Sequence, residues 1–154
     1  MNRYEEFQAF RTRLNRRILG GDREGDTPSS PSAAAKHDHA ATAGSLPNAP
    51  GPQPTGATLT TKRFFNLDAA AYKPGALDVK TKELLGLVAS MVLRCDDCIA
   101  YHIDQCISVG VSDEELWECF DIALIVGGSI VIPHMRRGVD FLDQARAARA
   151  NAKT

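Results

Sequence analysis

The sequence has no excess of charge of either sign: 18 Lys and Arg residues stand against 19 Asp and Glu residues, a formal net charge of −1. Proteins that bind nucleic acid through its phosphates carry a basic surplus, so we expect no nucleic-acid partner. No apolar run approaches the length of a bilayer span, and the first residues, Met1 to Glu6, are polar where a secretory signal would be basic and then apolar. We therefore expect a cytoplasmic protein without a membrane partner.

Cysteine is also scarce, with four residues in a chain of 154. The cytosol keeps thiols reduced, so a close cysteine pair there is more typical of catalysis or metal binding than of a structural disulfide. Cys95 and Cys98 form such a pair. Cys106 and Cys119 lack a partner at a recognised spacing, and we interpret them as core residues.

Large apolar residues are nearly absent from residues 22–58, which are rich in Pro, Ser, Ala, Gly and Thr. Such a segment cannot recover the entropy of ordering, so a disordered linker is predicted there. It separates an N-terminal helix, predicted over residues 1–21, from a helical domain over residues 59–154. His37 and His39 lie in the linker, where solvent exposure is a better interpretation than metal binding.

Apolar periodicity and capping signals predict only helices after the linker, and no strand pattern competes with them. The helices are expected to run from near Thr61 to Tyr72, from Asp78 to Leu93, from Cys95 to Val109, from Ser112 to Gly127 and from Ile130 to Ala148. Ser112 and Glu115 have the spacing of a capping box. Pro133 is expected to kink the last helix. The predicted fold class is all-α, a helical bundle.

The most informative segment is Cys95-Asp96-Asp97-Cys98-Ile99-Ala100-Tyr101-His102. On a helix, Cys98 lies about 60° and His102 about 20° around the axis from Cys95, so the three share one face. A helix N-terminus favours the thiolate, and a nearby imidazole relays protons to or from sulfur. Asp96 and Asp97 are expected to weaken this activation slightly by like-charge repulsion. The pattern predicts redox thiol chemistry.

With Glu83, these residues give the pattern Glu-x11-Cys-x2-Cys-x3-His, which resembles the alkyl hydroperoxidase D branch of the carboxymuconolactone decarboxylase family. The segments at residues 78–84 and 110–116 resemble the same family, and the match covers roughly residues 64–142. The resemblance implies the helical bundle of that family and a thiol-dependent peroxidase or disulfide reductase. It implies that Cys98 attacks a hydroperoxide, that Cys95 closes a disulfide with it, and that Glu83 and His102 relay protons.

The resemblance also implies the partners: a hydroperoxide substrate, a thioredoxin-like or lipoyl dithiol reductant, and other copies of the chain in a trimer or hexamer. Neither a cofactor nor a metal is expected. Zinc bound by Glu83, Cys95, Cys98 and His102 is a weaker interpretation, because the pair lies on a regular helix. His134 is expected to be structural. Two other functions stay open: a lyase that uses His102 as acid or base, and a non-enzymatic oligomeric redox sensor.

Overall fold

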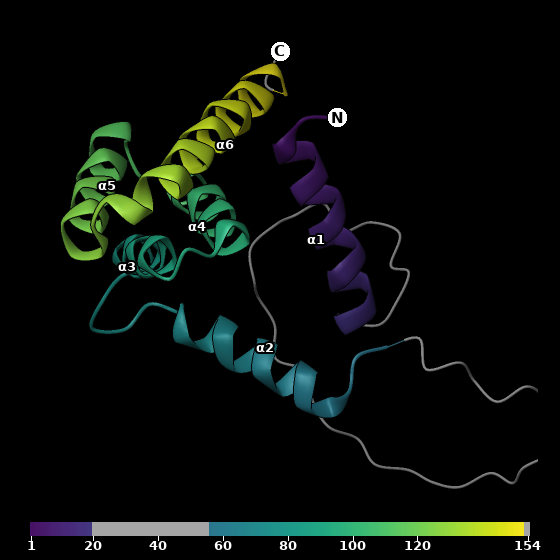
Figure 1. Ribbon diagram of the computed structural model, residues 1–154. Coiled ribbons are helices and arrows are strands. Elements are labelled where there is room, and N and C mark those ends of the chain that lie inside the picture. Colours follow the sequence, from purple (N-terminus) through teal and green to yellow (C-terminus); the bar gives the residue numbers. More distant parts are fainter. Residues whose placement is uncertain (20–55, 153–154) are drawn as a thin grey trace, which may run out of the picture.

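The structure, a computed structural model, describes residues 1–19 and 56–152. The helices are α1 (Arg3–Leu19), α2 (Leu59–Ala71), α3 (Val79–Val92), α4 (Asp96–Ser108), α5 (Asp113–Gly127) and α6 (Ile132–Asn151), with a 3-10 turn, η1 (Ser129–Val131), before α6. Within the described residues there is no strand, so the all-α prediction is confirmed (Figure 1). Residues 22–55 of the predicted disordered linker lie outside the described residues.

Helix α3 lies between α4 and α5, and α4 packs in turn against α6 (Figure 1). The core between these helices is apolar and includes Leu87, Met91, Ile99, Ile103, Leu116, Phe120 and Phe141, all almost fully buried. Gly138 of α6 faces α4 closely, since a Cβ there would lie 3.1 Å from Ile99 Cγ2 and 3.3 Å from Ile103 Cδ1. The helix that begins at the cysteine pair is thus held on two sides.

Helix α1 packs along α6. The rings of Tyr4 and Phe7 lie 5.5 Å and 5.4 Å from the ring of Phe141, measured between centroids. These three rings form an aromatic cluster between the two helices. Such a cluster stabilises a fold chiefly through the apolar area that it removes from water.

A buried carboxylate joins α1, α4 and α6. Asp104 of α4 is only 5% exposed. Its oxygens accept hydrogen bonds from Arg149 (2.7 Å), Gln8 (3.1 Å) and Arg11 (3.2 Å). Because a buried charge is tolerated only when it is paired, Asp104 fixes α1 to the helix that carries the cysteine pair.

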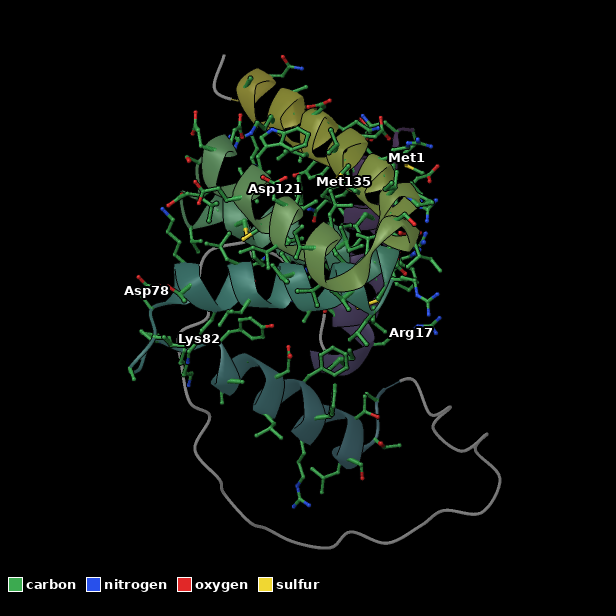
Figure 2. The ribbon with its side chains drawn as sticks, turned by 60° about the vertical axis from the view of Figure 1, so that its left-hand side comes forward. Met1, Arg17, Asp78, Lys82, Asp121 and Met135 are labelled. Atoms are coloured by element: carbon green, nitrogen blue, oxygen red, sulfur yellow. A yellow bond between two sulfur atoms is a disulfide. The ribbon has the colours of Figure 1, made fainter. Side chains whose placement is uncertain are left out.

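Helix α2 has no buried residue. It is held mainly at its ends: the N–H of Ala57 donates to the carbonyl of Arg17 at 3.0 Å. At the other end, Lys82 Nζ donates to the carbonyls of Ala71 (2.8 Å) and Lys73 (2.6 Å). Figure 2 shows Lys82 near the start of α3, beside the end of α2. The C-terminal end of α2 is therefore clamped onto α3.

The helix caps predicted at Asp78 and Ser112 are present in the structure. Asp78 accepts a hydrogen bond from the Thr81 N–H at 2.7 Å, and Ser112 forms the predicted capping box with Glu115. The prediction for Pro133 is wrong: it lies in the first turn of α6, where a missing N–H costs nothing, and so it introduces no kink. None of the helices in residues 1–19 and 56–152 has the length and apolar character to cross a bilayer.

Candidate active site

The cysteine pair begins at a sharp junction between α3 and α4. The N–H groups of Arg94 and Cys95 donate to the carbonyls of Met91 and Ser90, each at 3.0 Å, which closes α3 with a Schellman motif. This motif holds Arg94 at φ +60°, a left-handed conformation that a residue with a side chain adopts at a cost. Cys95 has extended backbone angles and caps α4, with its sulfur accepting from the Cys98 N–H at 3.4 Å. Cys95 therefore precedes the helix instead of lying within it.

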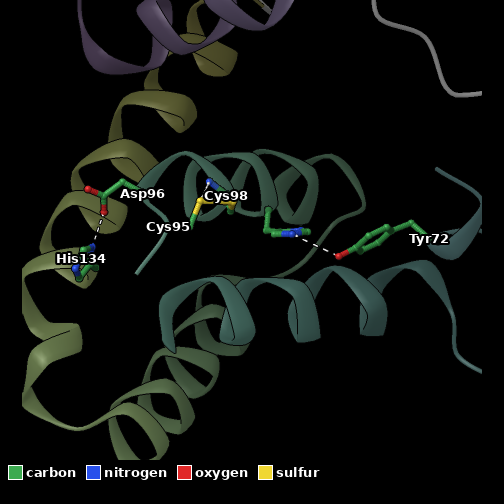
Figure 3. The surroundings of a disulfide bond; sticks show 6 residues. Tyr72, Cys95, Asp96, Cys98 and His134 are labelled. Carbon is green, nitrogen blue, oxygen red and sulfur yellow. Dashed lines mark hydrogen bonds and ion pairs between the residues drawn. A yellow bond between two sulfur atoms is a disulfide. The ribbon is translucent and has the colours of Figure 1, made fainter. Parts of the chain in front are cut away.

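Cys95 and Cys98 are joined by a disulfide, with their Cα atoms 5.2 Å apart (Figure 3). Cys98 is exposed and Cys95 is half-buried. The Cys98 sulfur is thus accessible to solvent and lies in the first turn of α4, at the positive end of the helix dipole. This environment favours a thiolate once the disulfide is reduced.

Glu83 and His102 form a buried pair beside the disulfide. Their exposed fractions are 3% and 8%, and His102 Nδ1 lies 2.8 Å from Glu83 Oε2. Nδ1–H donating to a carboxylate fixes the imidazole tautomer and leaves Nε2 for proton exchange. Within the described residues, no hydrogen bond joins His102 to either sulfur. The four predicted site residues thus form two bonded pairs, with Cys98 and His102 one helical turn apart on α4.

Tyr72, at the C-terminal end of α2, also contacts His102, although no sequence pattern indicates this contact. Its hydroxyl lies 3.4 Å from His102 Nε2, and the two ring centroids are 5.5 Å apart (Figure 3). Burial, and then the negative charge of Glu83, raise the pKa of Tyr72 above its ordinary value. The hydroxyl therefore keeps its proton at neutral pH.

Gly86 provides the room for this arrangement. A Cβ at this position would lie 2.5 Å from His102 Cε1 and 2.6 Å from the Tyr72 hydroxyl. A glycine in a helix interior costs about 1 kcal/mol relative to alanine, so its presence in the middle of α3 indicates a close approach. That signal was available in the sequence, but it does not show which side chains approach.

Asp96 links the start of α4 to α6. Its carboxylate lies 2.8 Å from His134 Nδ1, a contact drawn in Figure 3. The same carboxylate lies 2.8 Å from Arg137 Nε. Burial raises the pKa of Asp96, but the hydrogen bonds and charges of His134 and Arg137 outweigh it and bring the pKa below its ordinary value. The Asp96 carboxylate is thus paired with two basic side chains of α6, whereas Asp97 is exposed.

The other two cysteines are buried, as predicted. Burial, reinforced by Glu83, raises the pKa of Cys106 to about 12, and burial also raises the pKa of Cys119. Neither supplies a thiolate at neutral pH. In the part of the chain that the structure describes, no three His, Cys, Asp or Glu side chains converge as a metal site requires.

A model of the carboxymuconolactone decarboxylase family matches residues 59–140. This region contains α2 to α5 and the first part of α6, up to residue 140, including all the site residues described above. The chain therefore belongs to the carboxymuconolactone decarboxylase family. Helix α1, with its contacts to Asp104 and Phe141, lies outside the matched region.

Individual relatives agree with this assignment. One relative of known crystal structure is a family member from Thermotoga maritima that is described with a suggested role in an antioxidative response. Its sequence is 66% identical to this chain, the TM-score is 0.60, and the match covers 64% of this chain and 84% of the Thermotoga maritima chain. A family protein from Legionella pneumophila, solved in its apo form, is 29% identical with a TM-score of 0.53. That match covers 56% of this chain and 77% of the Legionella pneumophila chain. A protein of the cox locus of Paracoccus denitrificans is 26% identical over 85 residues, 55% of this chain and 77% of that protein.

Proposed function

We propose that this protein is a thiol-dependent peroxidase or disulfide reductase of the alkyl hydroperoxidase D type, and that it works in the cytosol. The observation that carries the proposal is the disulfide between the exposed Cys98 and its neighbour Cys95, next to the buried pair of Glu83 and His102. The antioxidative role suggested for the Thermotoga maritima relative supports the same direction.

The chemistry uses both sulfurs. The Cys98 thiolate attacks the outer oxygen of a hydroperoxide, so that an S–O bond forms, the O–O bond breaks, and the alkoxide leaves with one proton as an alcohol. The Cys95 thiol then attacks the sulfenic sulfur, which forms the disulfide and releases water. A dithiol reductant of thioredoxin-like or lipoyl type reduces the disulfide by thiol exchange and is itself oxidised to a disulfide.

In the proposed mechanism, Glu83 and His102 relay protons for these steps. The carboxylate holds Nδ1–H, so Nε2 is the nitrogen that takes up or releases a proton as a sulfur changes state. The pair is nearly shielded from water, where its electrostatic interactions are stronger than at an exposed surface.

Stopped-flow measurement of hydroperoxide consumption, with a dithiol reductant, tests the proposal. We expect Cys98→Ser to abolish turnover, because it removes the attacking sulfur. Cys119→Ala is the matched control: it removes a buried thiol that the mechanism does not use, and it should retain turnover. Equal rates for wild type and Cys98→Ser would refute the peroxidase proposal. Turnover of a carboxylated lactone by the double Cys→Ser variant would support the lyase alternative instead.

The proposal includes assembly of several copies of the chain. An apolar groove of about 460 Å³ lies between α3 and α5, and its wall includes Leu84, Leu85, Val88, Val92, Ile122 and Val126. Ile122 is 52% exposed and Val126 is 66% exposed, which is typical of a surface that a second subunit covers. Analytical ultracentrifugation should show an oligomer that Ile122→Asp dissociates, whereas Leu67→Asp on α2 leaves it intact. A monomeric wild type would contradict this part of the proposal.

A further inference from the structure

Both ring nitrogens of His102 have a partner in the structure. Nδ1 is paired with Glu83 at 2.8 Å, and Nε2 faces the Tyr72 hydroxyl at 3.4 Å. The three side chains come from α3, α4 and the end of α2, and they form one chain from carboxylate to imidazole to phenol. The family pattern of the sequence accounts for the first two groups, and Tyr72 is the group that it leaves unassigned.

One turn of α3 builds this juxtaposition. Lys82 holds the carbonyls of Ala71 and Lys73, which flank Tyr72 on either side. The next residue, Glu83, holds His102. Gly86, one turn further on, leaves the space in which the imidazole and the phenol meet. Since α2 buries no residue of its own, this clamp places Tyr72 against His102 without the help of a packed helix.

We propose that Tyr72 is a positioning residue of the redox site, which holds the His102 ring in its orientation and stabilises both of its protonation states. The inference rests on the proposed thiol chemistry, because it concerns the relay that serves the cysteine pair. It assigns a function to a hydroxyl that lies 30 positions before His102 in the sequence.

A hydroxyl suits this position because it both donates and accepts. The neutral imidazole accepts the phenol proton at Nε2, and the imidazolium donates its Nε2–H to the phenol oxygen. Phenylalanine at position 72 does neither. The charged form loses more from this change, because a hydrogen bond to a charged group is the stronger one and His102 is only 8% exposed. Protonation of the ring then requires a lower pH.

The test compares Tyr72→Phe with Tyr101→Phe. Tyr101 is the matched control, because its ring also packs on His102, with centroids 5.1 Å apart, but its hydroxyl makes no hydrogen bond to that imidazole in the described structure. The first readout is the pH dependence of the ¹⁵N signals of the His102 ring, assigned by their loss in His102→Asn. The second is the pH–rate profile of hydroperoxide turnover, with kcat and KM determined separately.

We expect the ¹⁵N titration midpoint of Tyr72→Phe to move to lower pH by roughly half to one unit, with the pH–rate profile moving in the same direction through kcat. Tyr101→Phe should leave both midpoints unchanged. An unchanged ¹⁵N midpoint in Tyr72→Phe, or an equal shift in both variants, would overturn the inference. If wild type shows no turnover but the ¹⁵N midpoint shifts as expected, the proposed function fails while the role of Tyr72 stands.

Discussion

Replacing Gly86 by alanine sets two effects of known sign against each other. Alanine favours a helix interior over glycine by about 1 kcal/mol, so propensity alone predicts a more stable protein. In the structure, however, the new methyl group would lie 2.5 Å from His102 Cε1 and 2.6 Å from the Tyr72 hydroxyl. Atoms at such distances overlap, so the imidazole or the phenol must move.

The steric effect is the larger one. Overpacking of this kind costs about 1–3 kcal/mol. Movement of the imidazole also weakens its bond to Glu83, which leaves a carboxylate buried without its partner at a further cost of about 1–3 kcal/mol. After the gain in propensity is subtracted, Gly86→Ala should destabilise the protein by about 3 kcal/mol. Hydroperoxide turnover should fall in the same variant, because the relay is displaced.

Gly138→Ala provides the internal comparison. Its Cβ would meet the Cγ2 methyl of Ile99 and the Cδ1 methyl of Ile103 at 3.1 Å and 3.3 Å, contacts that a shift of a few tenths of an ångström would relieve. Propensity and crowding then nearly cancel, within about 1 kcal/mol. Urea unfolding followed by circular dichroism measures both variants. A Gly86→Ala protein as stable as wild type would refute the reasoning about the close approach at α3.

Three further changes test other parts of the structure. Asp104→Ala should destabilise the protein by about 2 kcal/mol in urea unfolding and make α1 more sensitive to proteolysis, because it removes hydrogen bonds to a buried charge. Arg94→Gly should stabilise it by about 1 kcal/mol, measured in the same way, since glycine adopts the left-handed conformation freely. The lowered pKa of Asp96 stabilises the fold above the unfolded-state value of about 4, and this stabilisation is lost as the pH falls through the folded-state pKa. Asp96→Asn should therefore lower stability at pH 7 but not near pH 2.

The helices could be predicted because their signals are local. Asp78 and Ser112 each cap a helix through a residue three positions away, and apolar periodicity extends over a few turns. The pairing of Glu83 with His102 was expected from the family resemblance. The error at Pro133 is also local: the prediction begins the last helix at Ile130, whereas α6 begins at Ile132, so Pro133 lies in its first turn.

The contacts that complete the site depend on tertiary structure, so the sequence could not reveal them. Tyr72 meets His102 across 30 positions, and Asp96 meets His134 across 38. Neither separation corresponds to a helical or strand repeat. The contact between Tyr72 and His102 depends on the path of the chain from α2 to α3. The contact between Asp96 and His134 depends on the packing of α4 on α6. The basic partners of Asp96 likewise come from a distant helix, α6, and no local sequence signal indicates them.

The junction at Cys95 has a consequence for exchange between the two redox states. Its main chain is fixed by the bond from its N–H to the carbonyl of Ser90, and this bond does not involve the sulfur. We therefore expect the main chain at the junction of α3 and α4 to keep its position when the S–S bond opens or closes. The rate at which a reductant reacts with the exposed Cys98 should then depend on collision and on thiolate content instead of on a hinge motion.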